Sequence, residues 1–360
     1  MRKFFVLAAM AALVLLASRC AKNPSESWQD AELQLIKSTV KVHFPNARLI
    51  KDDSSLWVLA HAKSTSGNLR APQEDGYVEF AYCGRLLPIS RSVVYQTTDS
   101  LEARRLGTYA ATTHYAPIFA YYHVDYMQTA LHDALKEMHE GDTLTVLSAS
   151  WHAFGSTGTT GVAANTPVIF TLTLNEAVAN ADSAAARELR MVETYVATYN
   201  AAALDANAPT FAPAKDSTGT PLEGIYVCYI DTVPRNDSTP YAQTGDALNL
   251  KYSGYFLRDG FLLDSNIGTD VYEAGWSVDT ASSTSTYQTY YSHTFSKALL
   301  ATSSVKAFDV ALLNIAVGSR VAVAFTSSYG YGSSGTTTST TRPIYPYTPL
   351  RFYISFVSIP

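Results

Sequence analysis

Two stretches of the chain share one alternation of apolar and polar positions. In GYVEFAYCGRLL (76–87) and DALNLKYSGYFL (246–257), alternate residues are apolar up to a shared Tyr-x-Gly. A period of two predicts a half-buried strand. A strand-like run precedes each stretch (SSLWVLA, EGIYVCYI), and a helix-like run lies before that (DAELQLIKSTVKVHF, ARELRMVETYVATY). The pattern predicts two copies of one module, each with a leading helix.

Each copy continues with one short helix, a strand, an aromatic–glycine loop and a last strand. The helices are predicted in LHDALKEMHEGD and VKAFDVALLNIAVGS, where Gly141 and Gly318 mark the ends. The residues that share the apolar faces are Leu131, Ala134, Leu135 and Met138 in the first helix, and Val305, Phe308, Leu312 and Ile315 in the second. The loops are WHAFGSTG and SYGYGSSG, and the last strands are TPVIFTLTL and PLRFYISFV.

This order predicts an α+β fold, in which each module is an antiparallel sheet wrapped over one short amphipathic helix. A loop rich in Pro, Ala, Ser and Thr occupies 200–221. We place the first module with its leading helix at 31–178. The second module, with its leading helix and this linker, is placed at 179–360.

Composition favours an extracytoplasmic, β-rich protein. Charged residues make up 16% of the chain, below the typical value of about 25%, and there are 24 tyrosines. The formal net charge is -5 and no basic block occurs, which argues against nucleic acid as a partner.

The N-terminus has the features of a targeting segment. Arg2 and Lys3 precede FFVLAAMAALVLLA, which is too short to span a bilayer comfortably, and LASRC follows. This resembles a bacterial lipoprotein signal, with the signal at 1–19, a lipid-modified Cys20 and a tether at 20–30. Arg19 departs from the small residue usual before that cysteine, and plain secretion is the alternative. We expect lipid anchoring in the cell envelope at a membrane, the outer one by preference.

Other candidate chemistry is weak. Cys83 and Cys228 lie at non-equivalent places in the two copies, which favours isolated thiols over a disulfide, although one long-range bridge remains open. His132 and His139 share a helical face, where two solvated side chains are favoured over a metal pair. The Gly-rich loops lack a nucleophile elbow and a P-loop lysine. We expect no metal and no cofactor.

The second copy resembles the FKBP-type peptidyl-prolyl isomerases over about 224–359. GDALNLKYSGYFLRDGFLLDS is similar to the family's strand ending in Tyr-x-Gly, followed by a turn and Phe-Asp-Ser. VKAFDVALLNIAVGSRVAVAFTSSYGYG is similar to its helix, Val-Gly, strand and Tyr-x-Tyr-Gly loop, and PIYPYTPLRFYISFVSI to its Ile-Pro-Pro loop and final strand. Leading helices with a lipoprotein signal resemble envelope-anchored members.

The resemblance implies a proline-binding pocket in the second copy. It assigns Tyr252 and Phe352 to the aromatic strand positions, Asp264 to the pocket aspartate, and Tyr331 to the loop tyrosine whose hydroxyl binds a substrate carbonyl. The remaining implied substrate-binding residues are Leu263, Val305, Phe308 and Ile344. Leu263 stands where the family has Phe, and Phe308 where it has the Trp of the pocket floor. The segment 265–304 is longer than is usual in the family.

The first copy departs further from the family pattern. Gln96 falls at the aspartate position, Leu131 at the floor and Phe154 at the loop tyrosine, while Tyr82 and Phe170 remain. We interpret it as a degenerate copy.

The expected function is isomerisation of X–Pro bonds in exported or envelope proteins, with proline-containing polypeptides as partners. Taken singly, aromatic residues such as Tyr252 and Phe352 are better explained by core packing, and only the set in family order favours a proline-binding site. The first alternative is a non-catalytic chaperone or interaction lipoprotein that keeps the fold. The second is a surface lipoprotein that binds glycans or proteins, suggested by the Tyr and Thr content.

Overall fold

The computed structural model describes residues 24–360 except 68, 88–93, 160, 204, 206, 235–238, 277–290, 296–304, 338 and 340. The expected signal and Cys20 therefore lie outside the described residues, as does most of the segment 265–304. No helix in the described part of the chain is both long and apolar enough to cross a membrane.

The first repeat begins with a long helix and continues mainly as strands. Its elements are α2 (Pro24–His43), β1 (Arg48–Leu49), β2 (Leu56–Ala62), β3 (Gly76–Leu86), β4 (Val94–Thr97), α3 (Ser100–Arg105), β5 (Ile118–Tyr122), α4 (Thr129–Lys136), β6 (Thr143–Ser148), the 3-10 turn η2 (Ser150–His152) and β7 (Val168–Val178).

The second repeat has the same element types in the same order. They are α5 (Ala181–Ala201), β8 (Ala212–Lys215), β9 (Pro221–Asp231), β10 (Ala247–Phe256), β11 (Leu262–Ser265), α6 (Gly268–Glu273), β12 (Tyr291–Thr294), α7 (Ala307–Leu312), β13 (Arg320–Phe325), the 3-10 turn η4 (Ser327–Tyr329) and β14 (Leu350–Ser358). Helix α5 begins after Asn180, whose side chain accepts a hydrogen bond from the Ser183 backbone N–H at 2.9 Å.

The two sheets have identical topology. The strand order is β1-β2-β6-β7-β3-β4 in the first and β8-β9-β13-β14-β10-β11 in the second. In each, the strand before the short helix (β5 or β12) also pairs with the long strand β3 or β10. This confirms the predicted fold class: an α+β chain of two tandem modules, each an antiparallel sheet over one short helix.

The chain forms two compact units. One comprises 1–74, 80–99 and 122–177, and the other 75–79, 100–121 and 178–360. Segment 100–121 of the first repeat thus belongs to the second unit. There its His114 ring stacks on Phe256 with centroids 4.0 Å apart, and Trp276 donates a hydrogen bond to the Ala111 carbonyl at 3.2 Å.

Each face of the second sheet packs against a different helix. On β13, Val321, Val323 and Phe325 join the core that contains α7. The intervening Ala322 and Ala324 pack with Val192 and Val196 of α5, which contacts β9 and β13. The residues that point to either face of β13 are apolar, so the sheet is covered on both sides.

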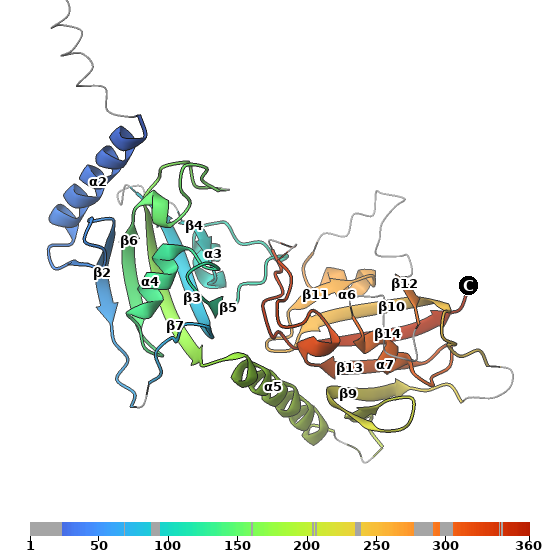
Figure 1. Cartoon of the computed structure of the whole chain (residues 1–360). Coiled ribbons are helices and arrows are strands. Elements are labelled where there is room, and N and C mark those ends of the chain that lie inside the picture. Colours follow the sequence, from blue (N-terminus) through green and yellow to red (C-terminus); the bar gives the residue numbers. More distant parts are fainter. Residues whose placement is uncertain are drawn as a thin grey trace, which may run out of the picture. The chain divides into compact units, whose positions relative to one another are not determined.

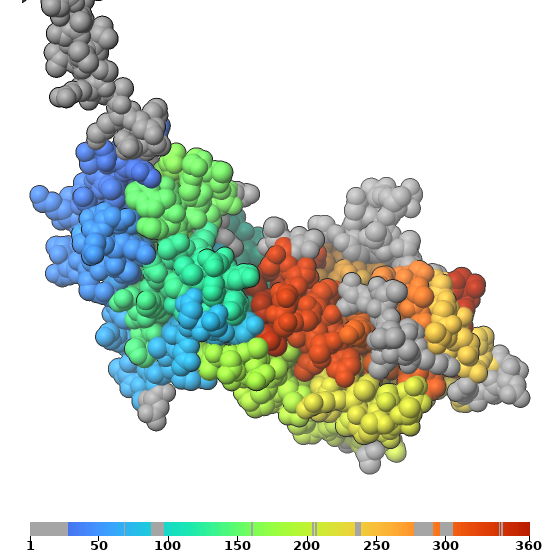
Figure 2. All heavy atoms as spheres, in the orientation of Figure 1, coloured from blue at the N-terminus to red at the C-terminus, as the bar shows by residue number. Residues whose placement is uncertain are grey.

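The first sheet is arranged in the same way. Ile36 and Val40 of α2 pack with Leu147, Ala149 and Ile169, and α4 contacts β6 in the same module. Figure 1 shows α2 beside β2 and β6, and in Figure 2 the atoms of the module pack closely on the visible face. The leading helices are therefore integral layers of the modules.

We expect Ile36→Ala to lower the free energy of unfolding of the first unit by about 2–5 kcal/mol, because its side chain is fully buried between α2 and the sheet. Leu35→Ala is the matched control, since that neighbour is 43% exposed and should change stability by no more than about 0.5 kcal/mol. Urea denaturation of both variants measures the difference. Equal costs would contradict this role for α2.

Candidate active site

Three aromatic rings from three elements of the second unit meet on the face of the sheet that carries α7. Tyr252 of β10, Phe308 of α7 and Phe352 of β14 have ring centroids 5.7, 5.9 and 5.2 Å apart for the pairs 252–308, 252–352 and 308–352. Phe308 and Phe352 are 3% exposed, whereas Tyr252 is half-buried. The tyrosine therefore presents the accessible edge of this aromatic cluster.

Asp264 supplies the charge at that edge. Strand β11 pairs with β10 so that Asp264 lies opposite Gly254, and its exposed carboxylate accepts a 2.6 Å hydrogen bond from the Tyr252 hydroxyl. Burial and then this hydrogen bond raise the pKa of Tyr252 well above its usual range. The Tyr252 hydroxyl therefore stays protonated at neutral pH and donates to Asp264.

Tyr331 packs against the same core from the loop after β13. Its side chain is half-buried, and burial followed by the charge of Asp264 raises its pKa. The hydroxyl thus stays protonated at neutral pH and can donate a hydrogen bond.

The remaining predicted residues lie in the same apolar cluster. Leu263 and Ile344 are buried, and Val305 is partly buried against the core. Backbone hydrogen bonds of 2.7 and 2.8 Å between Thr336 and Ile344 hold the wall segment to the Tyr331 loop. The structure therefore brings all eight predicted site residues to one region, while their roles in binding and catalysis stay predictions.

Tyr291 of β12 is a member of this region that sequence reasoning missed. Its ring makes edge contacts with Tyr252 and Phe308, at centroid distances of 5.5 and 5.9 Å, and it is 38% exposed. It lies in a Ser/Thr/Tyr-rich stretch with no strand alternation, which gave no signal. Behind it, the buried His293 ring contacts the Asp309 carboxylate at 2.7 Å, next to Phe308.

Helix α5 reaches the base of the Tyr331 loop through Glu188. This carboxylate is 2% exposed and accepts hydrogen bonds from the backbone N–H and the hydroxyl of Ser327, the latter at 2.8 Å. Burial raises the pKa of Glu188 to about 7, against the opposing effect of the Ser327 hydrogen bonds. Sequence reasoning missed Glu188, because a charged residue in an amphipathic helix predicts a solvated face.

The first repeat has the same strands and loop in this region but carries different side chains on them. Gln96 lies opposite Gly84 in the ladder, as Asp264 lies opposite Gly254 in the second repeat. Phe154 contacts Phe170 at 6.5 Å between ring centroids. The register places Gln96 at the aspartate position, as the sequence alignment indicates.

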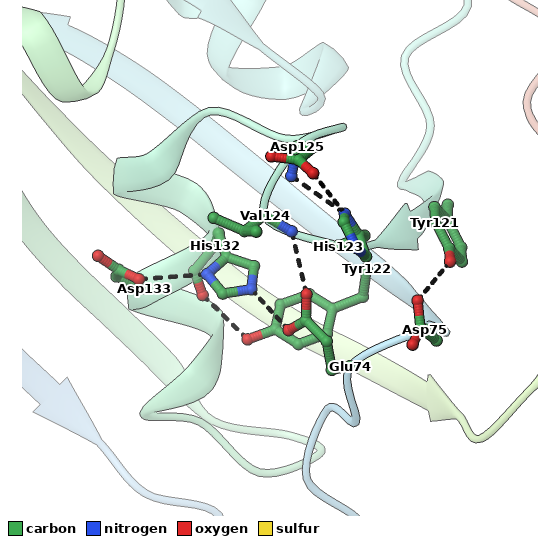
Figure 3. A network of polar contacts seen from close by, with 9 residues as sticks. All are labelled: Glu74, Asp75, Tyr121, Tyr122, His123, Val124, Asp125, His132 and Asp133. Atoms are coloured by element: carbon green, nitrogen blue, oxygen red, sulfur yellow. Dashed lines mark hydrogen bonds and ion pairs between the residues drawn. The ribbon is translucent and has the colours of Figure 1, made fainter.

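His132 of α4 corrects the expectation of two solvated histidines. His139 is exposed, but His132 is 6% exposed and lies between the carboxylates of Glu74 and Asp133, at 3.0 and 3.1 Å (Figure 3). The Tyr122 ring stacks on it at 4.6 Å. The two carboxylates provide polar partners for the His132 ring inside the module. The helical pattern alone could not show these contacts.

Within the described residues, no group of three or more His, Cys, Asp or Glu side chains could hold a metal ion. Cys228 is buried in β9 and is not disulfide-bonded, while Cys83 lies in the non-equivalent strand β3.

Comparison with known proteins gives structural matches only. No family model and no curated protein sequence matches the chain. The three FKBP domains of wheat FKBP73 match at 15% identity and TM-score 0.29, over 88% of this chain and 99% of that one. A peptidyl-prolyl cis-trans isomerase from Pseudomonas syringae matches at 19% identity and TM-score 0.31, over 43% and 97%. FkpA from Escherichia coli matches at 14% identity and TM-score 0.32, over 50% and 70%.

By their names, the first two matches are FKBP-type or peptidyl-prolyl isomerase proteins, the family that the sequence motifs resemble. At these TM-scores and identities, they say nothing of the chain's activity. Any function must therefore follow from the residues of the site themselves.

We expect Gly254→Ala to destabilise the second unit by about 1–3 kcal/mol. A Cβ at this position would lie 2.3 Å from the Phe352 ring, which would have to leave the aromatic cluster. Gly268→Ala is the control, because a Cβ there meets nothing within 4 Å. Urea denaturation of the two variants should separate them, and equal midpoints would contradict the close packing of Phe352 on β10.

Glu188 should make stability depend on pH. Its ordinary pKa of 4.5 applies to the unfolded chain and the raised value of about 7 to the folded one, so the folded chain holds the proton between these values. The associated stability is fully present below pH 4.5 and is lost as pH rises to 7, on the order of 3 kcal/mol. Urea denaturation from pH 4.5 to 8 should show this loss relative to Glu188→Gln, which cannot titrate. Parallel pH profiles would contradict it.

Proposed function

We propose that the second unit is an FKBP-type peptidyl-prolyl cis-trans isomerase. The observation that carries this is the convergence of Tyr252, Phe308 and Phe352 with two polar groups at their accessible edge, Asp264 and the hydroxyl of Tyr331. Aromatic rings next to a hydrogen-bond donor suit a proline ring with its preceding carbonyl.

Rotation about an X–Pro bond requires no bond to be made or broken. The barrier of about 18–20 kcal/mol arises because twisting removes the amide resonance. The planar isomers of X–Pro lie within about 1 kcal/mol of each other, so a catalyst needs only to favour the twisted state. That state has less charge separation than the planar amide, and an apolar surface favours it.

The residues of the site have different roles in this reaction, according to their chemistry. The three rings form the apolar surface, with Leu263, Val305 and Ile344 around it. Tyr331 holds the peptide by donating a hydrogen bond to a carbonyl, for which its raised pKa keeps it protonated. Asp264 fixes Tyr252 through the 2.6 Å hydrogen bond and places negative charge beside the bound peptide. The mechanism uses no metal or cofactor.

We further propose that the protein is a lipoprotein of the bacterial cell envelope and acts on exported polypeptides that contain proline. The motivation is the N-terminal sequence that ends at Cys20. Metabolic labelling with a radioactive fatty acid should mark the full chain and not Cys20→Ala. Labelling of both proteins would contradict the assignment.

We expect the full chain to accelerate cis-trans exchange of a short X–Pro peptide, measured by magnetisation-exchange NMR. Tyr331→Phe removes one hydrogen bond and should lower kcat/KM about 3- to 10-fold. Asp264→Ala removes a charged acceptor and should lower it about 10- to 100-fold. Phe154→Leu, in the equivalent loop of the first repeat, is the control and should leave the rate unchanged.

A folded chain with no acceleration would contradict the isomerase proposal. Peptide binding that survives in Tyr331→Phe would then favour the alternative, a non-catalytic chaperone or interaction lipoprotein. The departures at Leu263 and Phe308 make this alternative specific, because both residues reshape the surface that would contact proline.

A further inference from the structure

Ser327 connects helix α5 to the loop that carries Tyr331. Its N–H and hydroxyl both donate to Glu188. Its carbonyl accepts hydrogen bonds from the N–H groups of Gly330 and Gly332, each at 2.8 Å, on either side of Tyr331. A continuous series of hydrogen bonds therefore runs from a buried helix carboxylate to the backbone that flanks the loop tyrosine.

The first repeat contains the same connection. Glu32 of α2 accepts hydrogen bonds from the N–H and hydroxyl of Ser150, the latter at 2.7 Å. The Ser150 carbonyl accepts from Ala153 and Gly155, at 2.9 and 2.7 Å, on either side of Phe154. The two loops keep the same serine and share glycines at 155/332 and 158/335, and in both the acid on the leading helix and the bridged backbone recur.

We propose that Glu188 is a positioning residue that holds Tyr331 in place from the leading helix, so that α5 forms part of the functional site. This inference rests on the proposed isomerase function for its effect on catalysis, but the effect on the loop is independent of any activity. A buried N–H that loses its acceptor costs about 1–3 kcal/mol, so the loop would move to recover a partner.

Within the described residues Glu188 forms no salt bridge, and the adjacent Arg187 pairs with Glu79 instead. Glu223 of β9 and Tyr347 face the cavity that Glu188 also lines, and Arg187 is its neighbour along α5. Burial raises the pKa of Glu188 into the neutral range. Both protonation states can keep two hydrogen bonds, because a protonated carboxyl donates to the Ser327 hydroxyl while its other oxygen accepts the N–H.

The ability of the side chain to keep both hydrogen bonds determines the choice of variants. Glu188→Gln can also accept the N–H and donate to the hydroxyl, so it should preserve the connection. Glu188→Leu removes the acceptor of both Ser327 hydrogen bonds at similar volume and should break the connection. Ser327→Ala removes the hydroxyl alone and should have an intermediate effect, which keeps the test decisive if Glu188→Leu fails to fold.

The experiment uses the full chain and two readouts: amide hydrogen exchange at Gly330 and Gly332, and kcat/KM for the X–Pro peptide. We expect Glu188→Leu to accelerate exchange at least tenfold at both glycines and to lower kcat/KM about tenfold, with Glu188→Gln near wild type in both. Glu32→Leu is the matched control. It should accelerate exchange at Ala153 and Gly155 and leave kcat/KM unchanged.

Unchanged exchange at Gly330 and Gly332 in folded Glu188→Leu and Ser327→Ala would overturn the proposal. Faster exchange with unchanged kcat/KM would also overturn it, because Glu188 would then stabilise the loop without positioning a functional residue. If the wild type does not isomerise the peptide, the isomerase proposal fails, and the exchange data still decide whether Glu188 holds the loop.

Discussion

Each module depends on a sheet that is apolar on both faces. Along β13, Val321 and Val323 require cover on one side, while Ala322 and Ala324 require it on the other. The short helix α7 covers the first face and brings Phe308 to the aromatic cluster. The small alanines let α5 lie close to the second face, within reach of the turn at Ser327. Burial of the two faces of the sheet thus determines the positions of both the candidate site on one face and helix α5 with Glu188 on the other.

The alternation of apolar residues predicts the main strands, and the apolar spacing predicts the two short helices. The predicted ends of these helices are wrong, because α4 ends at Lys136 and α7 at Leu312, before Gly141 and Gly318. The register then confirms the position of Gln96 against Asp264, because each lies opposite the glycine of a Tyr-x-Gly motif. These features follow from local sequence, since strand period and chain reversal act over few residues. Five of the eight predicted site residues lie in such regular elements, whereas Val305, Tyr331 and Ile344 come from the connecting loops.

The features that sequence reasoning missed depend on contacts between distant segments. Apolar residues such as Ile36 and Val192 indicate that each leading helix has a buried face. They do not show which surface of the module covers that face. Glu188 and His132 are polar residues on helices, and only the folded chain shows that Ser327 and Glu74 accompany them inside. Tyr291 lies in a polar insertion whose pairing with β10 has no periodic signature.

The buried histidine contacts constrain how the two repeats can exchange sequence. The helix residue that follows the floor position is His132 beside Glu74 in one repeat and Asp309 beside His293 in the other. Recombination that moved only the helix into the second repeat would put a histidine against His293, and the reverse exchange would put an aspartate near Glu74. In the second repeat the incoming histidine would face buried His293 with only its own neighbour Asp133 as an acidic contact, and in the first an aspartate would face the exposed carboxylate of Glu74. Once basic and acidic groups had traded positions, the duplicated halves could no longer be homogenised piece by piece, which favours their continued divergence.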